Sequence, residues 1–337
     1  MKKLFLALSF ICHLSFAQTT AGHVVDANND AIPNVNIYLD GTTFVTQSAS
    51  DGSFFLDYKI LSSKNLVISY IGYRTKIESN YNNATDLRIV LQKETINLDE
   101  VTINFDQFSR AQKLNFFKNE FLGKTVNGRS CTIENENILY FFYDKNARTL
   151  QAFADKPLII INKNLGYKIN VDLIGFEAKF YRTNLNPSEM YRCYFEVLSH
   201  FEEVSKSDVI LRRRQKTYLG SQLHFFRNMS INEWTKRKFM LYVGNYAINP
   251  PDFFKITNDG FITTVEVKQD FKSFRKRTLP VFDIQYNKRK KSTVVFETNT
   301  FTIDIFGVNS HVEKIIFTGD LAERRVGSML PIDYGIK

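Results

Sequence analysis

A histidine and a glutamate three residues apart, with another histidine far downstream, form the pattern in this sequence that is closest to a metal site. His200 and Glu203 belong to the run His-Phe-Glu-Glu, and His311 follows much later. Two imidazoles and a carboxylate hold catalytic zinc in several hydrolases. A match this short arises easily by chance, and the residues around it alternate like a β-strand. We therefore predict no metal, no cofactor and no catalytic residue, and keep His200, Glu203 and His311 only as the ligand candidates of a hydrolase.

A second candidate for catalysis is His224, which precedes two phenylalanines. A catalytic histidine needs a nucleophile within hydrogen-bond reach, and the candidates for that role are Cys131 and Ser221. The sequence has no Gly-x-Ser-x-Gly elbow to present a serine. We expect His224 to be a hydrogen-bonded histidine of the hydrophobic core.

Cysteines are few. Cys12 lies in the leading segment, which leaves Cys131 and Cys193 in the rest of the chain. A disulfide requires Cα atoms within about 7 Å of one another, which spacing along the chain does not show. A Cys131–Cys193 disulfide and two separate buried thiols therefore both stay open.

The chain is moderately basic, with 44 Lys and Arg against 35 Asp and Glu and a net charge of +9. The densest basic cluster is Arg212, Arg213 and Arg214 with Lys216. Successive residues of a helix step about 100° around its axis, so these side chains fan out. We interpret the cluster as a solvated helix face, with contact to anionic lipid or glycan headgroups as the alternative. The composition does not favour nucleic-acid binding.

Residues 1–17 have the features of a signal peptide. Lys2 and Lys3 form a basic start, an apolar run follows, and small residues precede Gln18. We expect export and a mature chain that begins at Gln18, in the periplasm, associated with the outer membrane, or at the cell surface. Lipidation is not favoured, because Ile11 precedes Cys12 where a lipoprotein signal needs a small residue. No later stretch reaches 18 uninterrupted apolar residues, so we expect no transmembrane segment after signal removal.

Residues 22–103 alternate like β-strands. Val35, Ile37 and Leu39 should face one side while Asn36 and Tyr38 face the other. Short turn signals separate the runs, at Asn29-Asp30, Asp40-Gly41 and Asp51-Gly52. Closely spaced short strands of this kind are typical of a β-sandwich.

The motifs of this segment resemble the carboxypeptidase-regulatory-like domain, which is common in envelope proteins of Bacteroidetes. They are Gly22-x-Val24-x-Asp26, Ile32-Pro33-Asn34-Val35-Asn36-Ile37, Asp51-Gly52-x-Phe54 and Ser69-Tyr70-Ile71-Gly72-Tyr73. The resemblance implies a transthyretin-like sandwich of seven strands over residues 18–103. It also implies a non-catalytic module, because in metallocarboxypeptidases this sandwich carries none of the zinc ligands.

Residues 94–103 resemble the strand that follows this module in TonB-dependent outer-membrane receptors. About 230 residues remain after it, too few for a transporter barrel of 22 strands of roughly ten residues plus loops. The receptor itself is therefore excluded. An accessory role in TonB-dependent uptake stays open as an alternative function.

Residues 104–337 combine helices with many strand-like runs. A helix is expected over 109–122, begun by Asp106 and ended by Gly123. A second helical block covers 207–229, and Gly220 makes two short helices as acceptable as one long helix. The strand-like runs are 137–143, 149–154, 158–161, 167–176, 191–198, 239–243, 261–269, 281–286, 292–297, 301–306 and 312–318. This order predicts a larger α+β domain with antiparallel sheet, within a chain that is mainly β.

This second region also resembles a companion domain of flavobacterial proteins that has no assigned activity, through pieces such as Tyr218-Leu219-Gly220-Ser221. We therefore predict an exported, non-catalytic envelope protein with a binding or scaffolding role. Its partner is unknown, with an envelope protein, a peptide or a glycan as the classes considered. Exposed aromatic rings would suit peptides and sugars, and the candidates for such rings in the first domain are Tyr58, Tyr70, Tyr73 and Tyr81. The less favoured alternative is a zinc carboxypeptidase-like hydrolase.

Overall fold

The computed structural model describes residues 18–58, 65–79, 81, 84–94, 107–235, 238–268 and 279–336. The chain divides into two compact units, one made of Met1–Ile37 and Thr46–Glu94 and the other of Tyr38–Val45 and Thr95–Lys337. The expected signal peptide over residues 1–17 and the receptor-like strand near residues 98–103 lie outside the described residues. Within the described ranges, no helix is long and apolar enough to cross a membrane.

In the described residues, seven short strands build the first β-rich region, as the family resemblance implied. They are β1 (Gln18–Val25), β2 (Asn36–Leu39), β3 (Val45–Gln47), β4 (Ser53–Tyr58), β5 (Leu66–Ser69), β6 (Lys76–Glu78) and β7 (Leu87–Val90). One sheet has the order β4-β1-β7 and the other β3-β2-β5-β6. Strand β1 pairs antiparallel with β4 and parallel with β7. Val24, Val35 and Leu66 are fully buried, which gives the sandwich its apolar core.

The alternation expected in β2 is wrong at Tyr38. Ile37 and Leu39 are buried as predicted, but Tyr38 is also only 1% exposed. Its hydroxyl donates a 2.7 Å hydrogen bond to Asp172 Oδ2, and both residues belong to the second unit. Burial and the Asp172 carboxylate raise the pKa of Tyr38 well above its ordinary value. A tyrosine ring with a hydroxyl partner can be buried on the face that the pattern assigned to solvent.

Two of the four candidate surface tyrosines are also buried. Tyr58 and Tyr81 are both 0% exposed, and their rings meet edge to face at 5.9 Å. The Thr20 hydroxyl donates to the Tyr81 carbonyl and shares a hydrogen bond with the Tyr58 hydroxyl. These two rings belong to the core, so they offer no surface to a ligand.

A six-stranded antiparallel sheet opens the second unit. Its strands are β8 (Cys131–Ile133), β9 (Leu139–Asp144), β10 (Thr149–Ala154), β11 (Leu158–Asn162), β12 (Tyr167–Phe180) and β13 (Met190–Glu203). The order is β8-β11-β12-β10-β9, and β13 pairs with β12. Both β11 and β10 pair with β12, at opposite ends of this long strand. The expected strands are present, with β12 and β13 longer than predicted and β8 in addition.

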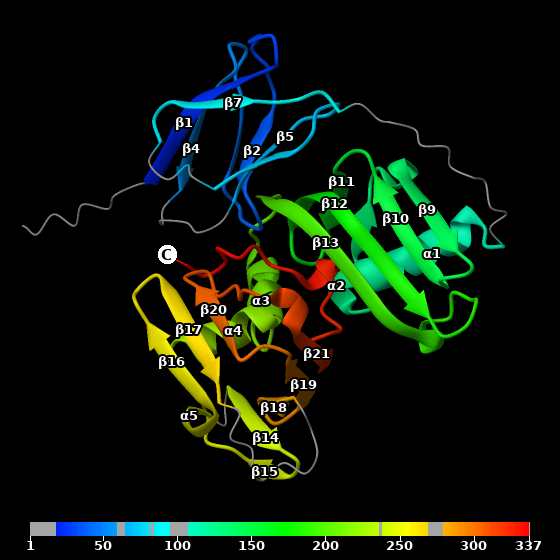
Figure 1. Ribbon diagram of the computed structural model, residues 1–337, viewed down its shortest axis with the longest axis vertical. Coiled ribbons are helices and arrows are strands. Elements are labelled where there is room, and N and C mark those ends of the chain that lie inside the picture. Colours follow the sequence, from blue (N-terminus) through cyan, green and yellow to red (C-terminus); the bar gives the residue numbers. More distant parts are fainter. Residues whose placement is uncertain are drawn as a thin grey trace, which may run out of the picture. The chain divides into compact units, whose positions relative to one another are not determined.

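Helix α1 (Arg110–Phe121) covers one face of this sheet (Figure 1). Phe117 stacks on Phe121 at 4.7 Å and meets Phe176 of β12 edge to face at 4.9 Å. The helix was expected to be capped by Asp106, which lies outside the described residues. Ser109 forms the cap instead, in a reciprocal capping box with Gln112.

The helical block after β13 is two helices, as the glycine allowed. They are α3 (Asp208–Tyr218) and α4 (Gln222–Ser230). Gly220 between them has φ +75°, and a Cβ there would lie 2.6 Å from a ring carbon of Tyr286. Helical spacing over residues 207–229 predicts one apolar face that includes Leu211 and Phe226. This prediction is wrong in part, because Leu211 is 43% exposed whereas Phe226 is 2% exposed.

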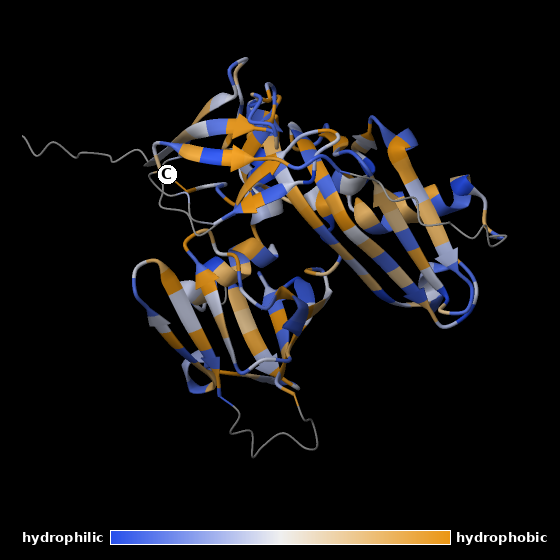
Figure 2. Cartoon of the chain, turned by 45° about the horizontal axis from the view of Figure 1, so that its top comes forward, coloured by the Kyte–Doolittle hydropathy of each residue, from blue (hydrophilic) through white to orange (hydrophobic). Residues whose placement is uncertain are grey.

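Two further sheets complete the second unit around a separate aromatic core. Their strands are β14 (Phe239–Val243), β15 (Tyr246–Ala247), β16 (Phe254–Asn258), β17 (Ile262–Val267), β18 (Val281–Tyr286), β19 (Lys290–Phe296), β20 (Thr300–Asp304) and β21 (Ile315–Gly319). The orders are β15-β14-β18-β19-β21 and β16-β17-β20. The predicted strand over 312–318 is wrong at its start, where Val312–Lys314 is a 3₁₀ turn, and β16 was not expected. Hydrophobic and hydrophilic bands alternate along the strands of these sheets (Figure 2).

Candidate functional site

The five-stranded sheet has an apolar inner face and a polar outer face. In β18, Phe282 and Ile284 are buried while Asp283 between them is exposed. In β19, Val294 is buried while Thr293 is half-buried. Because successive side chains of a strand point to opposite faces, the buried set fixes which polar residues reach the outer surface. Alternation in sequence therefore becomes a two-sided sheet.

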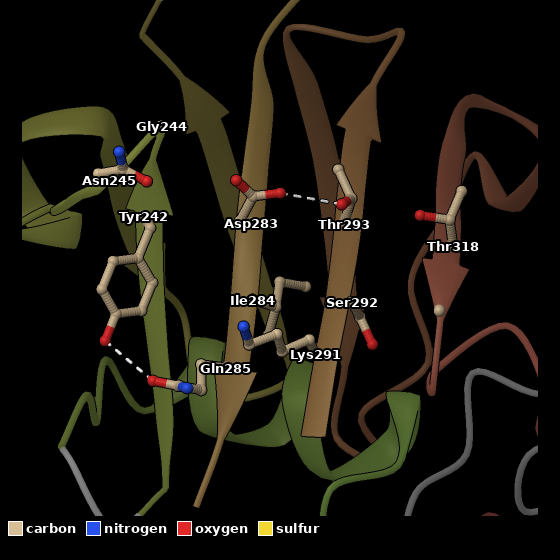
Figure 3. Close-up of a pocket in the computed structure, with 11 residues that line it drawn as sticks. Tyr242, Gly244, Asn245, Asp283, Ile284, Gln285, Lys291, Ser292, Thr293 and Thr318 are labelled. Atoms are coloured by element: carbon tan, nitrogen blue, oxygen red, sulfur yellow. Dashed lines mark hydrogen bonds between the residues drawn. The ribbon is translucent and has the colours of Figure 1, made fainter. Parts of the chain in front are cut away.

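Strand register aligns four of these outer residues in one row across the sheet. Tyr242 pairs with Asp283, Asp283 with Thr293, and Thr293 with Thr318. They come from β14, β18, β19 and β21, and directly opposite residues of neighbouring strands have side chains close enough to interact. The row is visible across the sheet in Figure 3.

A shallow groove of about 440 Å³ lies over this row. Its lining residues are Tyr242, Gly244, Asn245, Asp283, Ile284, Gln285, Lys291, Ser292, Thr293, Thr318 and Gly319. Two hydrogen bonds order its floor (Figure 3). The Tyr242 hydroxyl donates to Gln285 Oε1 at 3.0 Å, and the Thr293 hydroxyl donates to Asp283 Oδ1 at 3.0 Å. A volume of this size lies within the usual range for small-ligand sites.

These two bonds leave the groove with both donors and acceptors. The Gln285 amide keeps its NH₂ group, Asp283 keeps its second carboxylate oxygen, and Lys291 adds an ammonium. One carboxylate and one ammonium roughly cancel in charge. The Tyr242 ring adds an apolar surface at one end. This combination suits a neutral ligand rich in hydroxyl groups better than a strongly charged ligand.

The three metal-ligand candidates are not brought together. His200 and Glu203 are three residues apart on β13, so their side chains leave the strand on opposite faces. His311 lies outside β13, in a left-handed conformation before the Val312–Lys314 turn, and is about half exposed. Among the described residues, no group of three His, Cys, Asp or Glu side chains is placed to hold a metal ion.

His200 is a buried, neutral histidine of the sheet. It is 4% exposed, its ring centroid lies 4.5 Å from that of Tyr38, and Asn170 Nδ2 is 3.0 Å from its Nε2. Burial lowers the pKa of His200 to about 4, and the nearby Glu202 carboxylate only partly offsets this. The Nδ1 atom has no hydrogen-bond partner among the described residues.

Glu203 is held by an arginine from the basic cluster, and this corrects the view of that cluster as a solvated face. Arg214 is 1% exposed, and Nη1 donates to Glu203 Oε1. Its other nitrogens donate to the carbonyls of Leu165, Gly166 and Ser205 at 2.7 to 3.0 Å. The guanidinium carbon also lies 3.8 Å from the centroid of the Tyr167 ring. Arg212 and Arg213 are exposed, as expected.

His224 occupies the core, as predicted. It is 6% exposed, and its Nδ1 accepts a 3.0 Å hydrogen bond from the Gly220 N–H. Burial lowers its pKa to about 4, with help from the Lys238 charge. Ser221 caps helix α4 by accepting from the His224 backbone N–H, so its hydroxyl has a structural role.

The two cysteines are separate thiols, so the disulfide alternative is wrong. Cys131 in β8 and Cys193 in β13 are both free. Strands β11 and β12 lie between β8 and β13, which at about 4.8 Å per strand separates these two strands by about 14 Å. The register also places Cys131 level with Glu203 rather than with Cys193. Bridging requires about 7 Å or less. Burial raises the pKa of Cys131 to about 12 and that of Cys193 to about 11, which keeps both protonated.

Comparison with known families and structures bears on the first domain. The sequence profile of the CarboxypepD_reg-like domain matches residues 20–103, which confirms the resemblance of the motifs. Residues 20–103 are therefore a β-sandwich module similar to this domain. No curated protein sequence matches the chain.

Among solved structures, the chain is similar to a C-terminal interface mutant of a type II cohesin–X-dockerin complex from Acetivibrio cellulolyticus. The identity is 16% and the TM-score 0.19, and the match covers 22% of this chain and 56% of that chain. At this TM-score the likeness carries no argument about fold or function.

The groove residues were not singled out from the sequence. Each polar residue is an ordinary outward position of a predicted strand. The runs 239–243, 281–286 and 292–297 were identified, and their alternation could have separated the two faces. What joins Tyr242, Asp283, Thr293 and Thr318 is the register between strands, which one sequence does not reveal.

Proposed function

We propose that this protein is an exported, non-catalytic binding protein of the cell envelope. The signal-like residues 1–17 support export, and the CarboxypepD_reg-like domain supports a role without chemistry of its own. In this proposal the second unit binds the ligand. Association with the membrane or the cell surface belongs to the same proposal.

The groove on the five-stranded sheet is the site we propose for the ligand, and a neutral oligosaccharide is the ligand class. The observation that carries this choice is the row of Tyr242, Asp283, Thr293 and Thr318, with donors, acceptors and one aromatic ring on an open surface. A sugar presents alternating hydroxyls and C–H faces, which match hydrogen-bonding side chains and a tyrosine ring respectively.

The groove is open and its hydrogen bonds compete with water, so the affinity should be modest. We expect a binding free energy of about −4 to −5.5 kcal/mol, which corresponds to a Kd of about 10⁻³ to 10⁻⁴ M. Tyr242→Ala removes the ring contact and the hydrogen bond that holds the Gln285 side chain in place. It should therefore weaken binding at least about tenfold.

The test is a titration of the mature chain with neutral and acidic oligosaccharides, in which binding is measured by calorimetry or ligand-observed NMR. Tyr242→Ala should lose binding to the neutral sugars. Tyr246→Ala is the matched control, because Tyr246 lies in the same sheet, is 82% exposed and does not line the groove. Equal loss in both variants, or binding of none of the sugars by the unmodified chain, would rule out the groove as a glycan site.

Export is tested separately by N-terminal sequencing of the protein recovered from the envelope fraction of the producing cell. A mature chain that begins at Gln18 is the expected result. A chain that keeps Met1 in the cytoplasmic fraction would refute export without touching the groove.

The zinc hydrolase has no site in His200, Glu203 and His311, because the structure does not bring these residues together. The accessory role in TonB-dependent uptake depends on residues 98–103, which lie outside the described part of the chain.

A further inference from the structure

One side of strand β13, called the open side below, is covered only in part by the described residues. The other side of this strand pairs with β12 along its length. On the open side, the Gly41 N–H donates to the Ser199 carbonyl, and the Phe201 N–H donates to the Thr42 carbonyl. Around residues 192–197, no described part of the chain hydrogen-bonds to the backbone on this side. Unpaired edge strands of this kind are templates for the addition of another strand.

The backbone groups that reach this open side belong to odd-numbered residues. Ser199 and Phe201 show the direction, because their backbone groups bond to the segment near Gly41. N–H and C=O groups of successive residues point to alternate sides of a strand, so Cys193 and Phe195 also face the open side. The side chains of Cys193 and Phe195 pack against the core, which leaves their backbone groups as the available feature.

Even-numbered residues place their side chains on the outer face of the sheet. Arg192, Tyr194 and Glu196 are all exposed, and Tyr194 is 41% exposed. Neither Arg192 nor Glu196 has an ion-pair partner among the described residues. The Tyr194 hydroxyl donates to Glu196 Oε2 at 3.1 Å. Burial and this bond raise the pKa of Tyr194, and the charge of Glu313 contributes.

The charges on this edge are complementary to those on the same edge of a second copy. Arg192 and Glu196 lie at equal distances on either side of Tyr194. In an antiparallel pair of identical strands centred on Tyr194, Arg192 would face the partner's Glu196, and this contact would occur twice. The centre would pair Tyr194 with the partner's Tyr194.

We propose that the open edge of β13 is a self-association interface, in which two copies of this chain pair antiparallel about a two-fold axis at Tyr194. Cys193 and the partner's Phe195 then exchange backbone hydrogen bonds, which fits the direction in which both already point. Tyr194 and the Arg192–Glu196 pairs fall at the non-hydrogen-bonded positions, where opposite side chains lie closest. The six-stranded sheets of the two copies become one continuous sheet.

Charged residues on an edge strand can also serve to prevent pairing. The two roles differ in the arrangement of signs. Like charges at symmetric positions repel a second copy, whereas Arg192 and Glu196 attract one, since each meets its opposite across the axis. Charge reversal therefore distinguishes them.

The test is sedimentation velocity of the mature chain from about 1 to 200 µM, the range in which a weak dimer forms and dissociates. The unmodified chain should form a dimer. Arg192→Glu and Glu196→Arg each place like charges opposite one another twice, and each should weaken the dimer at least tenfold. The double variant R192E/E196R restores opposite charges and should restore the dimer. Lys145→Glu, an exposed charge reversal in the hairpin between β9 and β10, is the matched control and should change nothing.

A cross-link measures the register directly. Tyr194→Cys, made with Cys131 and Cys193 replaced by serine, should form an intermolecular disulfide under mild oxidation. The side chains at this position would face each other at a non-hydrogen-bonded pair, where Cβ atoms lie about 4.5 to 5.5 Å apart. A monomer at every concentration, a dimer insensitive to both single reversals, a double variant that stays monomeric, or no cross-link at position 194 would each overturn the proposal.

Discussion

Arg214 gives the most quantitative test of how the second unit is held together. Its guanidinium donates to the Glu203 carboxylate and to the carbonyls of Leu165, Gly166 and Ser205, while only 1% of the residue is exposed. Arg214→Ala removes all four bonds at once. The three carbonyls and the carboxylate then lack this donor, and water reaches these acceptors only in part.

The size of the effect follows from what is left behind. An unsatisfied buried polar group costs about 1 to 3 kcal/mol, and removal of one partner of a buried ion pair costs about 3 to 5 kcal/mol. Glu203 keeps Lys206 as a partner and is 27% exposed, which limits its share. We therefore expect Arg214→Ala to lower the free energy of unfolding by about 4 kcal/mol, a large part of the 5 to 15 kcal/mol typical of a folded domain.

The assay is urea unfolding, monitored by circular dichroism and by the fluorescence of Trp234, the single tryptophan. Arg213→Ala is the control, because Arg213 is the exposed neighbour on the same helix and should change stability by less than about 0.5 kcal/mol. A cost below about 1 kcal/mol for Arg214→Ala, or an equal cost for Arg213→Ala, would refute the reasoning.

Acid should reduce the difference between Arg214→Ala and the unmodified chain. Burial raises the pKa of Glu203, but the hydrogen bonds from Lys206 and Arg214 lower it by a larger amount, so the net shift of this pKa is downward. A carboxyl with a lowered pKa in the folded state stabilises that state above its ordinary pKa of about 4.3 and loses this contribution as pH falls through the lowered value. The Arg214 variant has less of this contribution to lose.

Three further predictions concern the core and the thiols. Gly220→Ala should destabilise the chain by about 2 kcal/mol in urea unfolding, because φ is +75° and a Cβ would lie 2.6 Å from the Tyr286 ring; an unchanged midpoint would contradict this. His224 has a pKa of about 4 in the folded chain against about 6.5 in the unfolded chain, so the free energy of unfolding should decrease as pH falls from about 6.5 to about 4. His224→Asn should remove up to about 3 kcal/mol of this decrease, and an unchanged pH dependence of urea unfolding would contradict the lowered pKa. Cys131 and Cys193 should react slowly with iodoacetamide at pH 7.5 and quickly in urea, with the same mobility in reducing and non-reducing gels.

The sequence predicted features that depend on neighbours in the chain. Gly220 divided the helical block because glycine is the residue that takes φ +75° without strain. His224 was expected in the core from the phenylalanines beside it, and it is there. The motifs of the first domain depend on turns and alternation within short strands, and the family profile confirms them.

The features it missed depend on contacts between distant segments. Arg214 follows two exposed arginines in the sequence. Its burial is explained by hydrogen bonds to Glu203 and to three carbonyls of the neighbouring loops. Tyr38 sits on the polar side of its strand, and its hydroxyl partner Asp172 is 134 residues away. The groove needs the register of four strands, which local patterns leave undetermined.

Hydrogen–deuterium exchange with and without a bound neutral oligosaccharide tests the central claim most directly, because it locates the ligand on the chain. We predict slower exchange in Phe239–Val243, Val281–Tyr286 and Lys290–Phe296, the strands that floor the groove, and unchanged exchange in the six-stranded sheet. Protection confined to any other part of the chain, or no protection at a sugar concentration several times the measured Kd, would contradict the assignment of this groove as the binding site.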